Sequence, residues 1–169
     1  MKRNVRRTSS STRKLTRGAL IAALYVGLTY VSTVFGLSSG AIQFRISEAL
    51  CILPVFMPEA IPGLFIGCMV ANIISGCVIW DIIFCSIATL IGALVAYTLR
   101  RLPEKFKWVC TLPNMVANML IVPLVLMYAY GVEDGYFILA LSVGIGELVC
   151  GVIGGTVLYY SVKDLKIFK

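Results

Sequence analysis

Long apolar stretches, separated by short polar breaks, run along nearly the whole chain of 169 residues. A stretch of about 20 apolar residues can cross the hydrocarbon core of a bilayer as a helix. The breaks are short enough for one compact bundle without a second domain. The predicted helical spans are approximately 16–36, 46–57, 60–77, 82–100, 108–130 and 135–162. Residues 1–15 then form a basic leader and residues 163–169 a tail, and both are predicted to be cytoplasmic.

The second span is unusually short. From Ile46 to Met57 it holds 12 residues, which gives about 18 Å of helix against a hydrocarbon core of about 30 Å. The connection before it, residues 36–45, is rich in glycine and serine. Irregular backbone at this depth is tolerated only where protein or a watery cavity satisfies it. We therefore expect residues 36–45 to form a re-entrant loop over a cavity in the outer half of the bundle.

The basic residues indicate how the chain is oriented. Seven lie in residues 2–17, four in residues 100–107 and three in the tail, so fourteen of the fifteen fall on one predicted side. Only Arg45 lies elsewhere. Because cytoplasmic loops carry the excess of Lys and Arg, this distribution places both termini in the cytoplasm.

Composition narrows the class of protein. The chain is 59% hydrophobic and 14% charged, whereas soluble domains carry roughly a quarter charged residues, so we expect an integral membrane protein. The acid-free leader is interpreted as a topology signal with some attraction to anionic lipid, and not as a nucleic-acid-binding segment. There is no histidine, and the six cysteines show no C-x-x-C spacing. No metal site, cofactor, disulfide framework or catalytic set is therefore predicted, and we expect no enzyme activity.

A carboxylate interrupts the last span, in the run SVGIGELVCG at 142–151. Glu147 near the middle of a membrane costs about 2.5–3.5 kcal/mol and is a functional-site hypothesis by default. In a helix it shares one face with small residues, which predicts an inward orientation beside a shallow, flat space. Those small residues are Ala140, Gly144, Gly151 and Gly154.

Other polar groups are expected near Glu147, toward the outer half of the bundle. The predicted substrate-binding set is Glu147, Glu48, Arg45, Gln43, Asp81, Trp80, Asn118, Asn72, Gly144 and Gly151. Each polar member has a structural alternative: Arg45 can pair with Glu48, Asp81 can stabilise a helix start, and asparagines can hold helices together. A carboxylate accepts paired N–H donors from a planar heterocycle or a ligand amine, and Trp80, Phe44 or Tyr128 are candidates to stack on the ring.

Small residues also recur at four-residue spacing in two other spans, where they let helix backbones approach closely. Gly63, Gly67 and Ala71 in the third span are interpreted as packing positions inside the bundle. Ala19 and Ala23 in the first span are suited equally to internal packing and to a partner subunit.

Three stretches resemble a known family. IQFRISEALCILPVFMPEAIPGLFIGCMVANIISG (42–76), WDIIFCSIATLIGAL (80–94) and VGIGELVCG (143–151) are similar to the QueT family, the queuosine-precursor substrate-binding (S) components of energy-coupling-factor (ECF) transporters. The resemblance runs from about residue 14 to 160. It implies an S-component fold of six membrane helices with a ligand pocket open to the extracellular side, in a multi-pass protein of the bacterial cell membrane.

The resemblance also implies partners and a ligand. The partners are a transmembrane T component, which docks on Ala19 and Ala23, and two cytoplasmic ABC-type ATPases that hydrolyse the ATP. The expected ligand is a 7-deazaguanine: queuine, or its aminomethyl or cyano precursor. We expect Glu147 or Glu48 to bind the ring edge and Asp81 a cationic arm. Two alternatives stay open, an S component for another flat vitamin-like heterocycle and a stand-alone proton-coupled permease.

Overall fold

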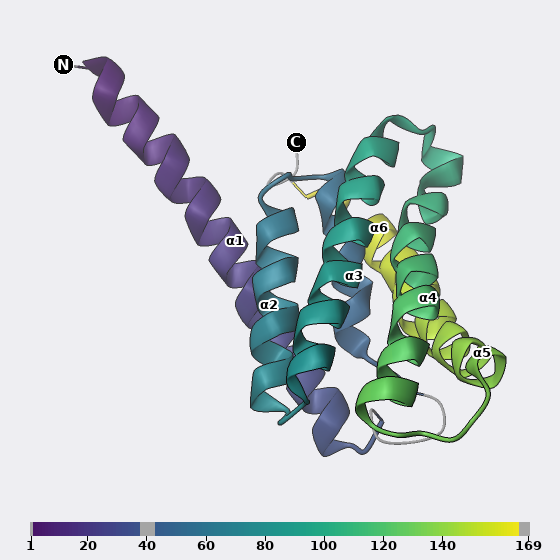
Figure 1. Ribbon diagram of the computed structural model, residues 1–169. Coiled ribbons are helices and arrows are strands. Elements are labelled where there is room, and N and C mark those ends of the chain that lie inside the picture. Colours follow the sequence, from purple (N-terminus) through teal and green to yellow (C-terminus); the bar gives the residue numbers. More distant parts are fainter. Residues whose placement is uncertain (1, 38–42, 166–169) are drawn as a thin grey trace.

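The computed structural model describes residues 2–37 and 43–165, and side chains from residue 11 onward. Residues 38–42, in the expected re-entrant loop, lie outside the described residues. All elements of the described part are helical (Figure 1). In chain order they are α1 (Lys2–Val34), η1 (Ile46–Val55), α2 (Ala60–Ile74), α3 (Ile79–Thr98), η2 (Leu99–Arg101), η3 (Glu104–Thr111), α4 (Leu112–Ala129), α5 (Tyr136–Glu147), η4 (Leu148–Gly154) and α6 (Gly155–Val162).

Four helical stretches are long and apolar enough to cross a membrane. They are Ser11–Val34, Ile79–Arg101, Glu104–Ala129 and Tyr136–Val162. Two shorter apolar helices, η1 and α2, complete the bundle. The prediction of an all-helical membrane bundle is thus confirmed, with four full-length helices and two short ones among the described residues.

The two ends of the bundle differ in the segments they carry. Figure 1 shows the start of α1, the end of α6 and the connection from α3 to α4 at the same end. The end of α1 and the connections from α2 to α3 and from α4 to α5 lie at the opposite end. The described parts of the three basic segments therefore lie at one end of the molecule.

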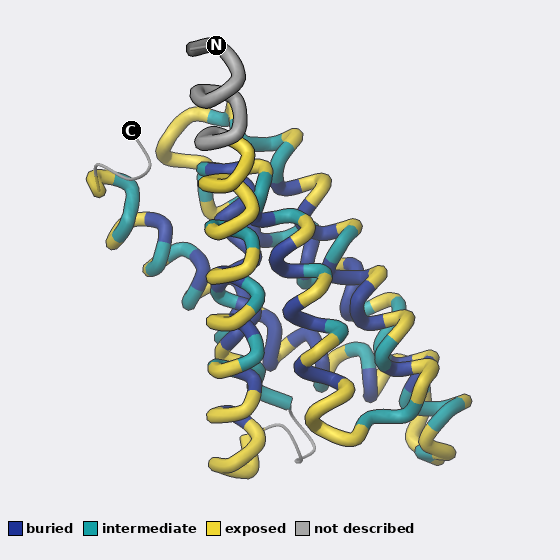
Figure 2. Tube along the Cα trace, turned by 90° about the vertical axis from the view of Figure 1, so that its left-hand side faces the viewer, coloured by how far each residue is buried: buried dark blue, intermediate teal, exposed yellow. Residues whose placement is uncertain are grey.

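The first helix is longer than its predicted span. It begins at Lys2, so the basic leader continues the helix and projects beyond the bundle (Figure 1). Figure 2 shows exposed residues along most of the length of α1. One face is buried, at Ile21, Tyr25, Thr29 and Ser32, whose spacings of four, four and three place them on one side of a helix.

The packing of α1 on α2 depends on glycine. A Cβ on Gly63 would lie 2.6 Å from the carbonyl oxygen of Gly18, and a Cβ on Gly67 would lie 2.9 Å from Cβ of Tyr25. The two helices approach closely because these side chains are absent. The predicted packing role of the third-span stripe is confirmed, whereas Ala19 and Ala23 lie on the exposed side of α1.

Two irregular segments lie next to the candidate site. η1 is a 3₁₀ helix that contains Pro54, which removes a backbone donor and disfavours a regular α-helix. η4 is a π-helical segment that starts directly after Glu147. π-Helical turns inside α-helices are frequent at functional sites.

Candidate functional site

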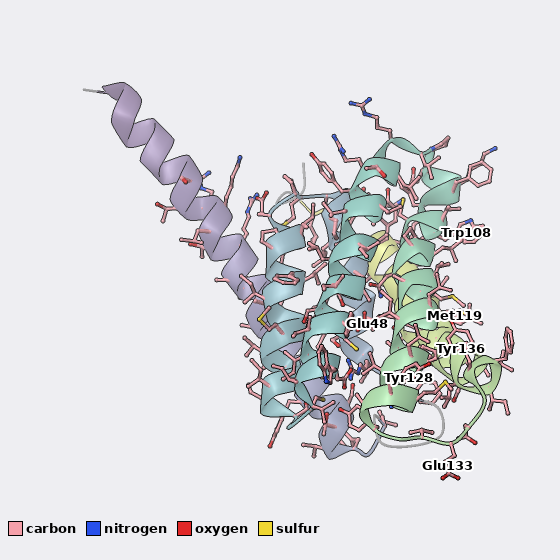
Figure 3. All side chains as sticks on the ribbon, in the orientation of Figure 1. Glu48, Trp108, Met119, Tyr128, Glu133 and Tyr136 are labelled. Carbon is pink, nitrogen blue, oxygen red and sulfur yellow. The ribbon has the colours of Figure 1, made fainter. Side chains whose placement is uncertain are left out.

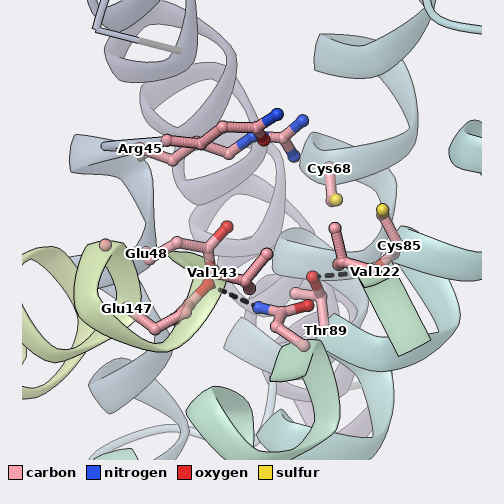
Figure 4. A pocket seen from close by; sticks show the side chains of 11 residues that line it. Arg45, Glu48, Cys68, Cys85, Thr89, Val122, Val143 and Glu147 are labelled. Carbon is pink, nitrogen blue, oxygen red and sulfur yellow. Dashed lines mark hydrogen bonds between the residues drawn. The ribbon is translucent and has the colours of Figure 1, made fainter. Parts of the chain in front are cut away.

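Five of the predicted site residues line one small cavity: Gln43, Arg45, Glu48, Asn118 and Glu147. Figure 4 shows Arg45, Glu48 and Glu147 converging on it. Arg45 comes from the segment before η1, Glu48 from η1 and Glu147 from α5. Glu147 is 7% exposed and Glu48 3%, so the predicted inward orientation of Glu147 is confirmed. The cavity measures about 30 Å³, roughly the volume of one water molecule. The flat space expected beside Glu147 is therefore too small for a ring in this conformation.

A hydrogen-bond network joins the two glutamates. Asn118 Nδ2 donates to Glu147 Oε1 at 2.6 Å. Asn114 Nδ2 donates to Glu48 Oε2 at 2.9 Å and lies 3.3 Å from Glu147 Oε2. Tyr25 Oη donates to Glu48 Oε1 at 2.5 Å. Since both carboxylates contact the same amide nitrogen of Asn114, they are immediate neighbours.

These carboxylates have no paired cation. Within residues 43–165 and the described part of α1, no ion pair of 4 Å or less involves Glu48, Glu147 or Arg45. The alternative in which Arg45 simply pairs with Glu48 is therefore wrong. Two neighbouring carboxylates without a bound cation are costly to bury in the charged form. The pair is suited to hold a proton or a cationic ligand group.

A second, larger cavity adjoins the first and measures about 330 Å³. Pockets that bind small molecules start at about 300 Å³, so this one has room for a compact ligand. Gln43, Arg45 and Val122 line both cavities, so the two cavities are neighbours. The remaining wall contains Thr29, Thr33, Ser75, Cys77, Asp81, Leu126, Tyr130 and Val132.

Asp81 supplies the acceptor of the larger cavity. It is 7% exposed and accepts a hydrogen bond from Tyr130 Oη at 2.9 Å, while Cys85 Sγ lies 2.6 Å from Oδ1. A carboxylate has about four lone-pair positions, so Asp81 retains capacity for a ligand. Arg45, lining the same cavity, contributes a planar fork of donors. The larger cavity therefore offers an acceptor group and a donor group to one ligand.

The predicted aromatic platform lies elsewhere. Trp80 is 56% exposed and stacks on Phe84, because consecutive helical residues point in different directions and Asp81 takes the inward one. Tyr128 is 86% exposed and lies on the outer surface (Figure 3). Both line an apolar hollow of about 480 Å³ between α3 and α4. Trp80 is thus not part of either polar cavity.

Three other predicted residues pack against neighbouring side chains and line neither polar cavity. Asn72 is buried in α2 with its Nδ2 3.7 Å from Cys68 Sγ, and lines neither polar cavity. A Cβ on Gly144 would lie 2.9 Å from Met119 Sδ, so a side chain of α4 fills the space that the sequence assigned to a ligand. A Cβ on Gly151 would lie 2.9 Å from Glu147 Oε2. Gly151 therefore adjoins the carboxylates without lining the cavity.

Several contributors were missed from the sequence. Tyr25 and Asn114 hold the carboxylates, Tyr130 binds Asp81, and Gly146 lines the small cavity. A Cβ on Gly146 would overlap the backbone carbonyl oxygen of Gln43, so this glycine lets the segment before η1 lie against α5. The polar positions of α1 were an available signal, since three of them share one face of an apolar helix.

Comparison with known proteins gives a consistent picture. The family described as QueT transporter matches residues 15–164. A curated protein of Lactococcus lactis subsp. cremoris, named queuosine precursor transporter QueT, is 37% identical over 92 residues. The alignment covers 53% of this chain and 53% of that protein, so the chain spans about half the length of the relative it matches. No solved structure is significantly similar to the chain.

Proposed function

Because the chain belongs to the QueT transporter family, we propose that it is the substrate-binding S component of an ATP-driven ECF importer. The proposed substrate is a 7-deazaguanine precursor of queuosine. The protein crosses the bacterial cell membrane six times with both termini in the cytoplasm, and η1 and α2 are its short spans. A T component and two ABC-type ATPases complete the importer, and ATP is hydrolysed on the latter. The observation that carries the proposal is the larger cavity, which joins Arg45 and Asp81 in one compartment.

The ring is placed in the larger cavity, since the small one has no room for it. Asp81 accepts hydrogen bonds from N1–H and the exocyclic amine, the edge that carboxylates recognise in guanine-like rings. Arg45 donates to the carbonyl oxygen O6, as arginine does when it reads guanine. Both residues line this cavity, and the ring edge then has a partner for its donors and for its acceptor.

The substituent on C7 lies beside O6, on the edge opposite the exocyclic amine, and in the proposed binding mode it is directed toward Glu48 and Glu147. Their cavity of about 30 Å³ is the size of an ammonium group or one water molecule. A protonated aminomethyl arm would supply the cation that these two carboxylates lack. This assignment reverses the roles expected from the sequence, and the volumes of the two cavities support it.

The partner-docking surface is proposed on the outer side of α1. Ala19 and Ala23 are exposed there, and a Cβ at Gly27 would meet nothing within 4 Å. A helix face of small residues permits close approach of another membrane helix. This supports docking of the T component on α1, on the side opposite the buried Tyr25.

One observation favours a second candidate, a stand-alone proton-coupled permease. Glu48 and Glu147 share the Asn114 donor and have no ion-pair partner within the described residues. Buried carboxylates of this kind form proton relays in membrane carriers. The same pair is explained in the S-component proposal by a cationic ligand arm.

Uptake by proteoliposomes separates the two functions. Vesicles containing this chain alone, or this chain with the T component and both ATPases, are loaded with ATP and given labelled aminomethyl deazaguanine. We expect uptake only in the complete complex, and loss of uptake when the ATPases cannot hydrolyse ATP. Uptake by the chain alone under a pH gradient would establish the permease. Absence of deazaguanine uptake and binding in both preparations would refute the proposed substrate.

A further inference from the structure

Three hydrogen bonds connect α1 to the start of η1 in a regular ladder. Tyr25 Oη donates to Glu48 Oε1 at 2.5 Å. The hydroxyl groups of Thr29 and Ser47 are hydrogen bonded at 2.8 Å. The backbone N–H of Ile46 donates to Ser32 Oγ at 3.0 Å. Successive turns of α1 thus bind successive residues of η1 in the reverse order.

The polar side chains of the ladder are buried, although Ile46 at its end is 38% exposed. Tyr25, Thr29, Ser32 and Ser47 are at most 2% exposed, and Glu48 is 3% exposed. In a membrane, small apolar residues suffice to pack two helices, as the glycines between α1 and α2 do. Polar side chains at this depth are costly unless satisfied and commonly mark functional positions. We therefore infer that the ladder has a function besides packing η1 against α1.

Its last step ends on a residue of the site. Glu48 has one oxygen on Tyr25, and its other oxygen lies on Asn114 Nδ2, the nitrogen that also approaches Glu147. The bond from Tyr25 thus selects the rotamer in which Glu48 faces Glu147 and the small cavity. Arg45, which lines both cavities, immediately precedes the residues held by the ladder.

We propose that Tyr25 is a positioning residue for ligand binding: from α1, it orients the Glu48 carboxylate so that Glu48 and Glu147 together receive a cationic ligand group. The proposal rests on the proposed function for the identity of the ligand. Tyr25 itself lines neither polar cavity, so it acts through Glu48 and not by touching the ligand. Other groups around Glu48 are the Cys51 thiol, 3.3 Å from Oε2, and Arg45 on the cavity wall.

The test is a double-mutant cycle on the purified full chain, titrated calorimetrically with 7-aminomethyl- and 7-cyano-7-deazaguanine. Tyr25→Phe retains the ring and removes only the hydroxyl group. We expect it to weaken binding of the amine by at least about tenfold, the usual effect of losing a hydrogen bond to a buried charge, and binding of the nitrile by far less. In a Glu48→Gln background the same change should have little further effect, because residues that act as one unit are not additive. Tyr30→Phe, at a tyrosine on the exposed side of α1, is the matched control and should bind like the wild type.

The outcomes separate this inference from the proposed function. If the wild type binds neither deazaguanine, the proposed substrate is wrong. If the wild type binds both and Tyr25→Phe binds the amine equally well, the positioning role is wrong. Equal weakening for both ligands that adds to the Glu48→Gln effect would show a purely structural role and would also overturn the inference. Thermal unfolding of the ligand-free variants reports whether Tyr25→Phe remains folded. If it does not, Ser47→Ala tests the adjacent step of the ladder, at a residue that lines neither polar cavity.

Discussion

At the scale of single residues, the site contains three buried carboxylates and one guanidinium group. Glu48, Asp81 and Glu147 are each at most 7% exposed, and Arg45 is the cation that lines both cavities. Asp81 lines the larger cavity and the two glutamates line the small one. In the proposed binding mode the ligand meets one acidic group at the ring edge and two at its arm, which gives the two regions different chemical preferences.

Exchange of Glu147 for Gln should change the preference between ligands. Gln has nearly the same shape and keeps an oxygen for Asn118, so we expect the protein to fold and the nitrile to bind almost normally. Binding of the aminomethyl compound should weaken by at least about tenfold, because the ammonium loses a charged partner. Calorimetric titration of both compounds measures the difference. Equal affinities of the variant and the wild type for the amine would place the arm elsewhere.

At the scale of elements, the site depends on how closely the segment before η1 lies against α5. Gly146 meets the Gln43 carbonyl oxygen there, and backbone cannot move aside as a flexible side chain can. The π-helical η4 begins directly after Glu147. At its end, a Cβ on Gly154 would lie 3.3 Å from Cβ of Ala49 in η1. These close contacts hold Gln43 and Arg45 between the two cavities.

Gly146→Ala should therefore damage both stability and binding. Overpacking of a tight contact costs about 1–3 kcal/mol, which corresponds to a decrease in Tm of about 2–10 °C for a chain of this size. We also expect weaker binding of every deazaguanine, since Gln43 and Arg45 are displaced together. Gly27→Ala is the control, because its Cβ would meet nothing within 4 Å. Equal Tm values for the two variants would contradict the close approach.

The sequence predicts the elements better than the space between them. The inward orientation of Glu147 follows from hydrophobic periodicity, which a single chain displays. Two features depend on how α3, α4 and α5 pack. Met119 fills the space beside Gly144, and Asp81, not Trp80, points inward. Asn114 is absent from the predicted substrate-binding set because its two acidic partners lie 66 and 33 residues away. Such contacts are set by tertiary packing and leave no local pattern.

At the scale of the whole molecule, the larger cavity and the basic segments lie at opposite ends. Its lining residues Cys77, Asp81 and Tyr130 belong to the ends of α2, α3 and α4 that face away from both termini in Figure 1. The exposed loop residue Glu133 lies at the same end (Figure 3). In the proposed topology, with cytoplasmic termini, the cavity is on the extracellular side, as the proposed substrate-binding role requires.

Cys77 offers a test of this orientation in the native chain. It is half-buried on the cavity wall, whereas Cys51, Cys68, Cys85 and Cys110 are buried. We expect a membrane-impermeant maleimide to label intact cells at Cys77, and Cys77→Ser to remove the labelling. A bound deazaguanine should slow the reaction by covering the thiol. Labelling that requires permeabilised cells would reverse the proposed topology.

The most direct test of the proposed binding site is a calorimetric titration of the aminomethyl deazaguanine into the wild type, Asp81→Asn and Glu133→Gln. The wild type and the exposed-loop control Glu133→Gln should bind one ligand with equal affinity. Asp81→Asn should bind at least about tenfold more weakly, because one of the two carboxylate acceptors is replaced by an NH₂ donor that faces a donor of the ring edge. Unchanged affinity in Asp81→Asn, in a protein that remains folded, would contradict placement of the ring between Arg45 and Asp81.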